Sequence, residues 1–164
     1  MAPQDICTLE PYRPYGAELK ETRPYSPCRA ACPAHTDVQA YVGLIAQGKY
    51  TEAFEVITSG NPIASVCSMI CHHPCEQSCR RCGIDEPLAV RHLKRFAIEK
   101  SSDYRRNKRK LAQKTRGKRV GIIGSGPSGL TAARDLADLG YSVTLFEKHP
   151  VLGGMLAAAI PPYR

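Results

Sequence analysis

The sequence predicts an α-helical unit followed by the first β-α-β unit of an α/β fold. Two segments carry this prediction: a ladder of cysteines, CSMICHHPCEQSC at 67–79, and a glycine-rich turn between two apolar runs at 118–148. A doubly wound domain needs more strands than the residues up to Arg164 supply, so the α/β part is expected to be incomplete. We expect four segments: an extended arm at 1–27, a helical domain at 28–103, a basic linker at 104–117 and a partial α/β domain at 118–164.

Composition narrows the class of protein. Of 164 residues, 43% are hydrophobic and eight are cysteine. The longest apolar run, Met155 to Ile160, is far shorter than the ~20 residues of a membrane helix. The first residues show neither the basic nor the apolar region of a signal peptide. We therefore expect a cytoplasmic protein, whose reduced thiols serve metal or redox chemistry more than structural disulfides.

The formal net charge of +8 is concentrated in YRRNKRKLAQKTRGKR at 104–119. This segment is interpreted as a solvated inter-domain linker, with a nucleic-acid or partner-binding stripe as the alternative. No aromatic residue follows Tyr104 within it, so stacked bases would find no platform.

Apolar periodicity predicts three helices around the cysteine ladder. The first is expected to be capped by Thr36, with Gln39 three residues on, and to end at Gly48. The second covers about 51–58 and is stopped by SGNP, and the third starts at Asp85-Glu86-Pro87 and runs to Lys100. The residues expected to be wholly or partly buried are Val38, Tyr41, Val42 and Ile45; Ala53, Phe54 and Ile57; and Leu88, Leu93, Phe96 and Ala97.

The cysteine ladder combines two closely spaced pairs. Cys67 and Cys71 are four residues apart, which places them on one face of a helix. Pro74 cannot continue that helix, so Cys75 and Cys79 are expected on a separate turn. With the upstream pair Cys28 and Cys32, these thiols can surround a compact inorganic group from several sides.

The spacing favours iron–sulfur chemistry over zinc. Zinc sites usually use C-x2-C, whereas here three residues separate neighbouring cysteines. Cys32 is followed by proline, as in the C-x3-C-P ending of bacterial ferredoxins, whose last cysteine binds a different cluster from its predecessors. Six candidate ligands exceed the need of one 4Fe-4S cluster and fall short of the eight that two clusters take, which Cys7 and Cys82 would complete; two clusters are expected. The candidates are Cys28, Cys32, Cys67, Cys71, Cys75 and Cys79.

Four residues near this ladder have other interpretations. His72 and His73 are expected at the surface or behind the ligands rather than on a metal. Cys7 and Cys82 lie outside the spacing, and each is either a spare thiol or a missing ligand.

The glycine-rich turn predicts a nucleotide site. Gly124, Gly126 and Gly129 form G-x-G-x-x-G between a strand with Val120, Ile122 and Ile123, expected to be buried, and a helix with Leu130, Ala133 and Leu136. The glycines allow a tight turn, close approach to a pyrophosphate and close helix packing, and the helix N-terminus offers free N–H donors.

A second strand, Ser142 to Phe146, ends in Glu147, whose carboxylate is placed to accept hydrogen bonds from a ribose. An acidic residue here disfavours a 2′-phosphate and favours FAD or NAD over NADP. The expected cofactor-binding residues are Gly124, Ser125, Gly126, Pro127, Ser128, Gly129, Glu147, Lys148, Gly153 and Gly154.

The order of CRAACP, NPIASVCSMICHHPCEQSC, GKRVGIIGSGPSGLTAA, FEK and GGMLAAAIPPYR resembles the glutamate synthase small-subunit family. That family is related to the N-terminal region of dihydropyrimidine dehydrogenase, and the resemblance covers about residues 24–164. It implies a helical domain with two 4Fe-4S clusters ahead of FAD and NADPH domains. It further implies that Gly124, Gly126, Gly129 and Glu147 bind FAD, with Gly153, Gly154 and IPPYR alongside.

The resemblance also implies a division of ligands, with Cys32, Cys71 and Cys75 on one cluster and Cys28 and Cys79 on the other. The sequence departs from the family at four places. Lys20 and Arg23 stand where the family has its first two cysteines, Lys94 where it has a non-cysteine ligand, and AAA at 157–159 where it has an Arg-Tyr-Gly type of segment.

The expected function is an electron-transfer flavoprotein segment. It would pass electrons from a pyridine nucleotide through FAD and the clusters to a partner subunit or to further domains, because a flavin converts hydride transfer into one-electron steps. The alternatives are a zinc-stabilised, basic nucleic-acid-binding module and a cluster-bearing scaffold without turnover.

Overall fold

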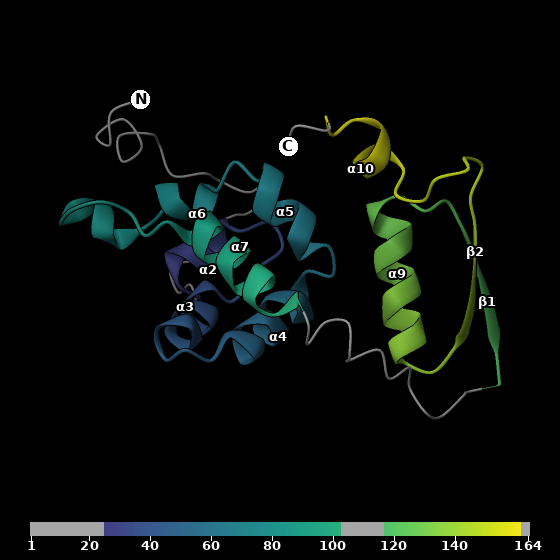
Figure 1. Ribbon diagram of the computed structural model, residues 1–164, viewed down its shortest axis with the longest axis horizontal. Helices are drawn as coiled ribbons and strands as arrows, with labels where there is room; N and C mark the ends of the chain where they lie inside the picture. Colours follow the sequence, from purple (N-terminus) through teal and green to yellow (C-terminus); the bar gives the residue numbers. More distant parts are fainter. Residues whose placement is uncertain (1–24, 103–116, 162–164) are drawn as a thin grey trace. The chain divides into compact units, whose positions relative to one another are not determined.

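The computed structural model describes residues 25–102 and 117–161, and the chain divides into two compact units, 1–102 and 103–164. Figure 1 shows the first as a group of short helices and the second as a helix beside two strands. The described part leaves out residues 1–24, 103–116 and 162–164, which include most of the predicted arm at 1–27 and of the predicted linker at 104–117. Within that part, no helix has the length and apolar character needed to span a membrane.

The first unit contains six α-helices and one 3₁₀ turn among its described residues. These elements are α2 (Pro27–Ala31), α3 (Val38–Ala46), α4 (Tyr50–Gly60), α5 (Ala64–Ile70), α6 (Pro74–Gln77), η1 (Arg80–Gly83) and α7 (Val90–Lys100). The helix α7 packs against α3, α4 and α5, while α2 packs against α6. The chain thereby brings the upstream cysteine pair next to the second half of the ladder.

The core of this unit is small. Tyr41, Ala53, Ile57 and Ala97 are fully enclosed, and Val90 is 2% exposed. Burying an isoleucine or valine side chain contributes about 1.5–3 kcal/mol, so a few such residues supply only a modest driving force. The predicted burial of Ala53, Phe54 and Ile57 on α4 is confirmed.

Two helix starts differ from the sequence prediction. The N-cap of α3 is Asp37, whose carboxylate accepts the Ala40 N–H at 3.1 Å, while the predicted cap Thr36 is buried with its hydroxyl 3.7 Å from the sulfur of Cys32. The helix α7 begins at Val90 instead of at Pro87. A residue of another helix provides a hydrogen-bond acceptor for the first turn of α7: the Glu76 carboxylate on α6 accepts the Arg91 N–H at 2.8 Å.

Three features of the cysteine ladder follow from its proline and its turns. Cys71 is the residue that ends α5, in extended conformation, so Cys67 and Cys71 do not both lie within one helix as predicted. Pro74 opens the separate turn α6, as expected, and His73 before it takes a left-handed φ of 51°. Cys79 then precedes η1.

The second unit is a β-α-β arrangement. Strand β1 (Arg119–Ile123) pairs in parallel with β2 (Ser142–Phe146), in the register Arg119 opposite Ser142 and Ile123 opposite Phe146. The helix α9 (Pro127–Asp138) connects them and packs on the sheet, and α10 (Met155–Ala158) follows. The predicted strand–turn–helix–strand order is therefore present in the structure.

The prediction that β1 is a buried strand is wrong for one of its residues. Val120 and Ile122 face α9 and are half-buried, whereas Ile123 is 93% exposed. Successive side chains of a strand point to opposite faces, so the helix on one face of a two-stranded sheet covers only alternate residues.

Candidate functional site

Five of the described cysteines fall into two groups. Cys75 is buried, and its charge interactions identify Cys32 and Cys71 as neighbours, together with Glu76 and Lys94. The pKa of the Cys75 thiol is raised to about 12, first by burial and then by the negative charges of Glu76 and Cys32, while Lys94 lowers it. A thiol in this environment becomes a thiolate only when a metal takes the place of its proton.

Hydrogen-bond donors and polar groups are placed around the Cys71 sulfur and backbone. The backbone N–H of His73 donates to Cys71 Sγ at 3.2 Å, which the left-handed conformation of His73 makes possible. The guanidinium of Arg91 donates to the Cys71 carbonyl at 2.9 Å. His73 Nδ1 is 3.2 Å from Glu76 Oε2, although their orientation is not that of a hydrogen bond. Donors to ligand sulfurs are a usual feature of iron–sulfur sites.

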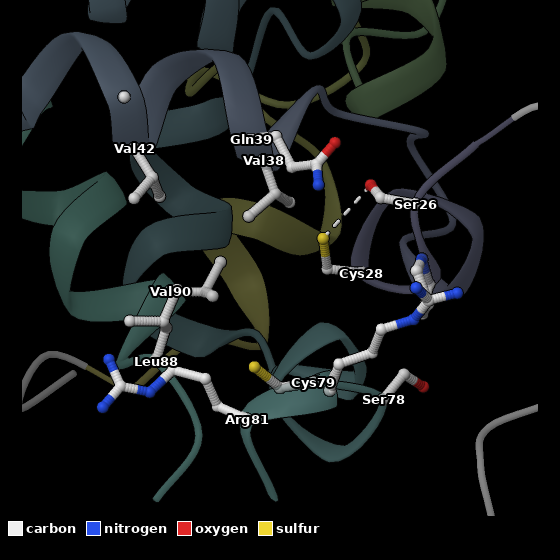
Figure 2. Close-up of a pocket in the computed structure, with 13 residues that line it drawn as sticks. Ser26, Cys28, Val38, Gln39, Val42, Ser78, Cys79, Arg81, Leu88 and Val90 are labelled. Carbon is white, nitrogen blue, oxygen red and sulfur yellow. Dashed lines mark hydrogen bonds between the residues drawn. The ribbon is translucent and has the colours of Figure 1, made fainter. Parts of the chain in front are cut away.

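The second group lines a cavity of about 400 Å³. Cys28 and Cys79 both border it, and Figure 2 shows their thiols among Val38, Leu88 and Val90. Cys28 Sγ is 3.3 Å from Ser26 Oγ. Two thiols in one cavity agree with the pair implied by the resemblance, but Lys20 and Arg23 lie outside the described residues.

Tyr41 stands near the cysteines of both groups. Its side chain is fully buried and its hydroxyl donates to the Val90 carbonyl at 3.3 Å. Burial raises the pKa of Tyr41, and the negative charges of Cys75, Cys32 and Cys28 raise it further. The sequence predicted only that Tyr41 would be buried; its place near both groups comes from the packing of α3 against α2 and α7.

Cys67, Cys82 and Cys7 belong to neither group. Cys67 is half-buried on α5, and its carbonyl accepts the N–H of Cys71 at 3.0 Å. Cys82 is not one of the free thiols, and Cys7 lies outside the described residues.

The described residues contain no site for a single metal ion built from three or more His, Cys, Asp or Glu side chains. An isolated zinc ion needs its sulfur ligands at about 2.3 Å, so they must converge on one point. An iron–sulfur cluster is a larger body, and its ligands surround a volume instead. Cys32 and Cys71 both act on the charge of the buried Cys75, and thiols grouped in this way suit a body that several sulfurs hold together.

The glycine-rich turn has a tightly folded backbone with open space beside it. Gly124 has a φ of 94°, and a Cβ on Gly129 would lie 2.0 Å from the Gly124 carbonyl oxygen. A Cβ on Gly126 would meet no protein atom within 4 Å, so the space beside it is free for a ligand. No side chain caps the N-terminus of α9, where Gly126 is the N-cap and Pro127 follows. Its N–H groups are therefore available to phosphate oxygens.

Ser125 joins three parts of this site. Its side chain is fully buried, and both its N–H, at 2.8 Å, and its hydroxyl donate to Glu147 Oε2. The N–H of Gly153 donates to the Ser125 hydroxyl at 3.0 Å, which holds the second glycine pair against the turn. A Cβ on Gly154 would be 2.9 Å from the Gly126 Cα. The hydroxyl of Ser125 therefore takes part in hydrogen bonds on both sides, to Glu147 and from Gly153.

Glu147 is already hydrogen-bonded within the protein. Besides Ser125, the N–H of His149 donates to Glu147 Oε1 at 3.0 Å. Each carboxylate oxygen has two lone pairs, so acceptor capacity remains for a ribose hydroxyl. The predicted residues Ser128 and Lys148 are exposed and Pro127 is half-buried.

The pKa of Glu147 is lowered to about 2, first by the hydroxyl of Ser125 and then by the N–H groups of His149 and Ser125. A carboxylate with a lowered folded-state pKa contributes stability above its ordinary pKa, here 4.5, and loses it as the pH falls toward 2. We expect carboxyl-carbon NMR titration to place the Glu147 midpoint near 2, and Ser125→Ala to move it toward 4.5. A midpoint near 4.5 in the unsubstituted protein would refute the bonding described here.

Comparison with known proteins gives two family matches. Residues 23–106 match the family described as dihydropyrimidine dehydrogenase domain II, 4Fe-4S cluster. Residues 122–159 match the NAD(P)-binding Rossmann-like domain. The first match contains all six candidate cysteines, and the second contains the glycine-rich turn, both strand ends and Glu147.

Several curated proteins align over 85% of this chain. It is 43% identical over 162 residues to the NADP(+)-dependent formate dehydrogenase subunit beta of Moorella thermoacetica, covering 23% of that protein. It is 38% identical over 141 residues to the NADPH-Fe(3+) oxidoreductase subunit beta of Geobacter sulfurreducens, covering 21%. It is 39% identical over 141 residues to the NAD-dependent dihydropyrimidine dehydrogenase subunit PreT of Salmonella typhimurium, covering 34%.

The chain thus spans between a fifth and about a third of the length of these relatives. The helical unit, with its two groups of thiols, and the glycine-rich β-α-β unit follow one another in the order of the two matched families. The alternative of a zinc-stabilised nucleic-acid-binding module is not supported. The family model covers half of the sequence, and the chain therefore belongs to the dihydropyrimidine dehydrogenase domain II, 4Fe-4S cluster family.

Proposed function

We propose that this chain is the electron-transfer segment of a pyridine-nucleotide-dependent oxidoreductase, in which FAD and iron–sulfur clusters relay electrons to a partner. The observation that carries the proposal is the combination of grouped, partly buried thiols with a phosphate-binding turn in one chain. The relatives are named as NADP(+)-, NADPH- or NAD-dependent oxidoreductase subunits, which supports this reaction class. The six free thiols among the described residues suit a reducing, cytoplasmic compartment.

FAD is our proposal for the nucleotide at the glycine-rich turn. Glu147, at the end of β2, is ionised and close to the turn, and a carboxylate there accepts ribose hydroxyls but repels a 2′-phosphate. The turn and the N-terminus of α9 would hold the pyrophosphate. The flavin, when bound, would exchange a hydride for single electrons. Residues outside the described ranges would make the other contacts with the flavin. They would also bind NAD(P)H and the partner subunit.

We assign Cys32, Cys71 and Cys75 to one cluster and Cys28 and Cys79 to a second. The first assignment rests on the mutual charge effects at Cys75, and the second on the shared cavity. Cys67 is the described thiol that remains as a candidate fourth ligand of the first site. The role of the chain's own residues is to exclude water, orient the sulfurs and donate hydrogen bonds to them.

Anaerobic iron and sulfide analysis of the protein tests both the proposed function and the number of clusters. Two 4Fe-4S clusters give about eight of each per chain, and one gives about four. If both are present, Cys28→Ser should remove about half of the iron and leave the EPR signal of the other cluster. About four irons that Cys28→Ser leaves unchanged would show that the cavity holds no cluster, and colourless, iron-free protein would refute the function.

A further inference from the structure

Lys94 is a positively charged residue on the buried face of α7. It is 8% exposed, and it lies on the same helical stripe as Val90 and Ala97, which are 2% and 0% exposed. The described residues provide no hydrogen bond or ion pair to its ammonium group. Most of the side chain is buried, and the ammonium group keeps some contact with water, since it is not one of the described nitrogens that are buried without a hydrogen-bond partner.

The surroundings of Lys94 contain thiols and one carboxylate, that of Glu76, which also acts on Cys75. The charge of Lys94 acts on Cys75, which is itself buried and lies among Cys32 and Cys71. The nearby carboxylate of Glu76 already accepts the Arg91 N–H at 2.8 Å and faces His73. Sulfurs that hold a metal cluster would add further negative charge to this region, beside the positive charge of Lys94.

We propose that Lys94 compensates the negative charge of the cluster held by Cys32, Cys71 and Cys75 and thereby raises its reduction potential, without binding iron itself. This inference rests on the proposed function. Reduction transfers one electron to the cluster, with no atom gained or lost, and makes it more negative by one charge. A neighbouring cation stabilises the reduced form more than the oxidised form, because Coulomb attraction grows with the charge of its partner.

Three variants separate charge from ligation. Lys94→Met removes the charge and keeps an apolar side chain of similar length. Lys94→Arg keeps the charge, but a guanidinium does not lose its proton and cannot bind iron. Lys100→Met is the matched control, because Lys100 is on the same helix, is exposed, and has its ammonium group 5.7 Å from the centre of the Phe96 ring.

The measurement is an EPR-monitored redox titration of the anaerobically purified, iron-loaded proteins with soluble mediators. We expect Lys94→Met to disfavour reduction at least tenfold, which lowers the midpoint potential of a one-electron couple by about 59 mV. Lys94→Arg should retain its iron and shift the potential much less, and Lys100→Met should match the unsubstituted protein. An unchanged potential in Lys94→Met would overturn the proposal.

Iron content provides a second criterion if Lys94→Met does not assemble the cluster. Loss of iron in Lys94→Met with retention in Lys94→Arg supports the proposal, because the charge alone is then required. Loss of iron in both variants overturns it, because the lysine nitrogen would then be acting as a ligand. Iron-free unsubstituted protein refutes the proposed function itself. Iron-loaded protein whose reduction potential does not change when Lys94 is substituted refutes only the role proposed for Lys94.

Discussion

Removing iron with a chelator under anaerobic, reducing conditions is expected to unfold the helical unit from about residue 28 to 100. Its core contains few large apolar side chains, and it also encloses Glu76 and Lys94, each 8% exposed. Structural zinc contributes about 10–16 kcal/mol to the folding of small domains, as much as the 5–15 kcal/mol by which whole proteins are stable. A cluster held by thiols of this unit would contribute on the same scale.

The measurement combines far-UV circular dichroism with hydrogen exchange resolved by peptide. Amides of α3, α4 and α7 should lose protection after chelation, whereas those of β1, α9 and β2 should respond much less, because their unit contains none of the candidate cysteines. The same chelator saturated with iron beforehand is the control. Full retention of helical signal in protein shown to be iron-free would mean that the apolar core alone stabilises the unit.

Gly126→Ala is expected to lower flavin affinity by at least about tenfold, or ~1.4 kcal/mol, while leaving the fold intact. Gly126 has a φ of −65°, which any residue adopts, and its added Cβ would touch no protein atom within 4 Å. The methyl group would instead occupy the space in which the backbone meets a pyrophosphate. Gly129→Ala would differ in kind, because its Cβ would lie 2.0 Å from a backbone oxygen and would disrupt the turn.

Flavin content and affinity should be measured in a protein that includes the remainder of the nucleotide domain. Gly121→Ala on β1 is the matched control, since its Cβ would meet only the ring of Phe146, at 3.3 Å, and that side chain is half-exposed and can shift. Undiminished FAD binding by a folded Gly126→Ala protein would remove the turn from the cofactor site.

The β-α-β unit could be predicted closely because its signals are local. The apolar runs, the three glycines and the acidic residue after the second strand are each read within a few residues, and β2 occupies the predicted Ser142–Phe146. The turn from Gly124 to Gly129 likewise depends on short-range backbone sterics. The exposure of Ile123 was not predicted, because a run of apolar residues does not reveal how many faces of the strand are covered.

The spacing of the cysteines in the sequence was enough by itself to predict iron–sulfur chemistry and to indicate the family. The sequence also determined the helix stop at Asn61 and the separate turn that begins at Pro74, because backbone restrictions act locally. Only the tertiary structure decided which thiols face one another, why α7 begins at Val90 beside Glu76, and that Lys94 lies on a buried face. Those outcomes depend on contacts between helices distant in the chain, and helical periodicity specifies a buried face without specifying what lies against it.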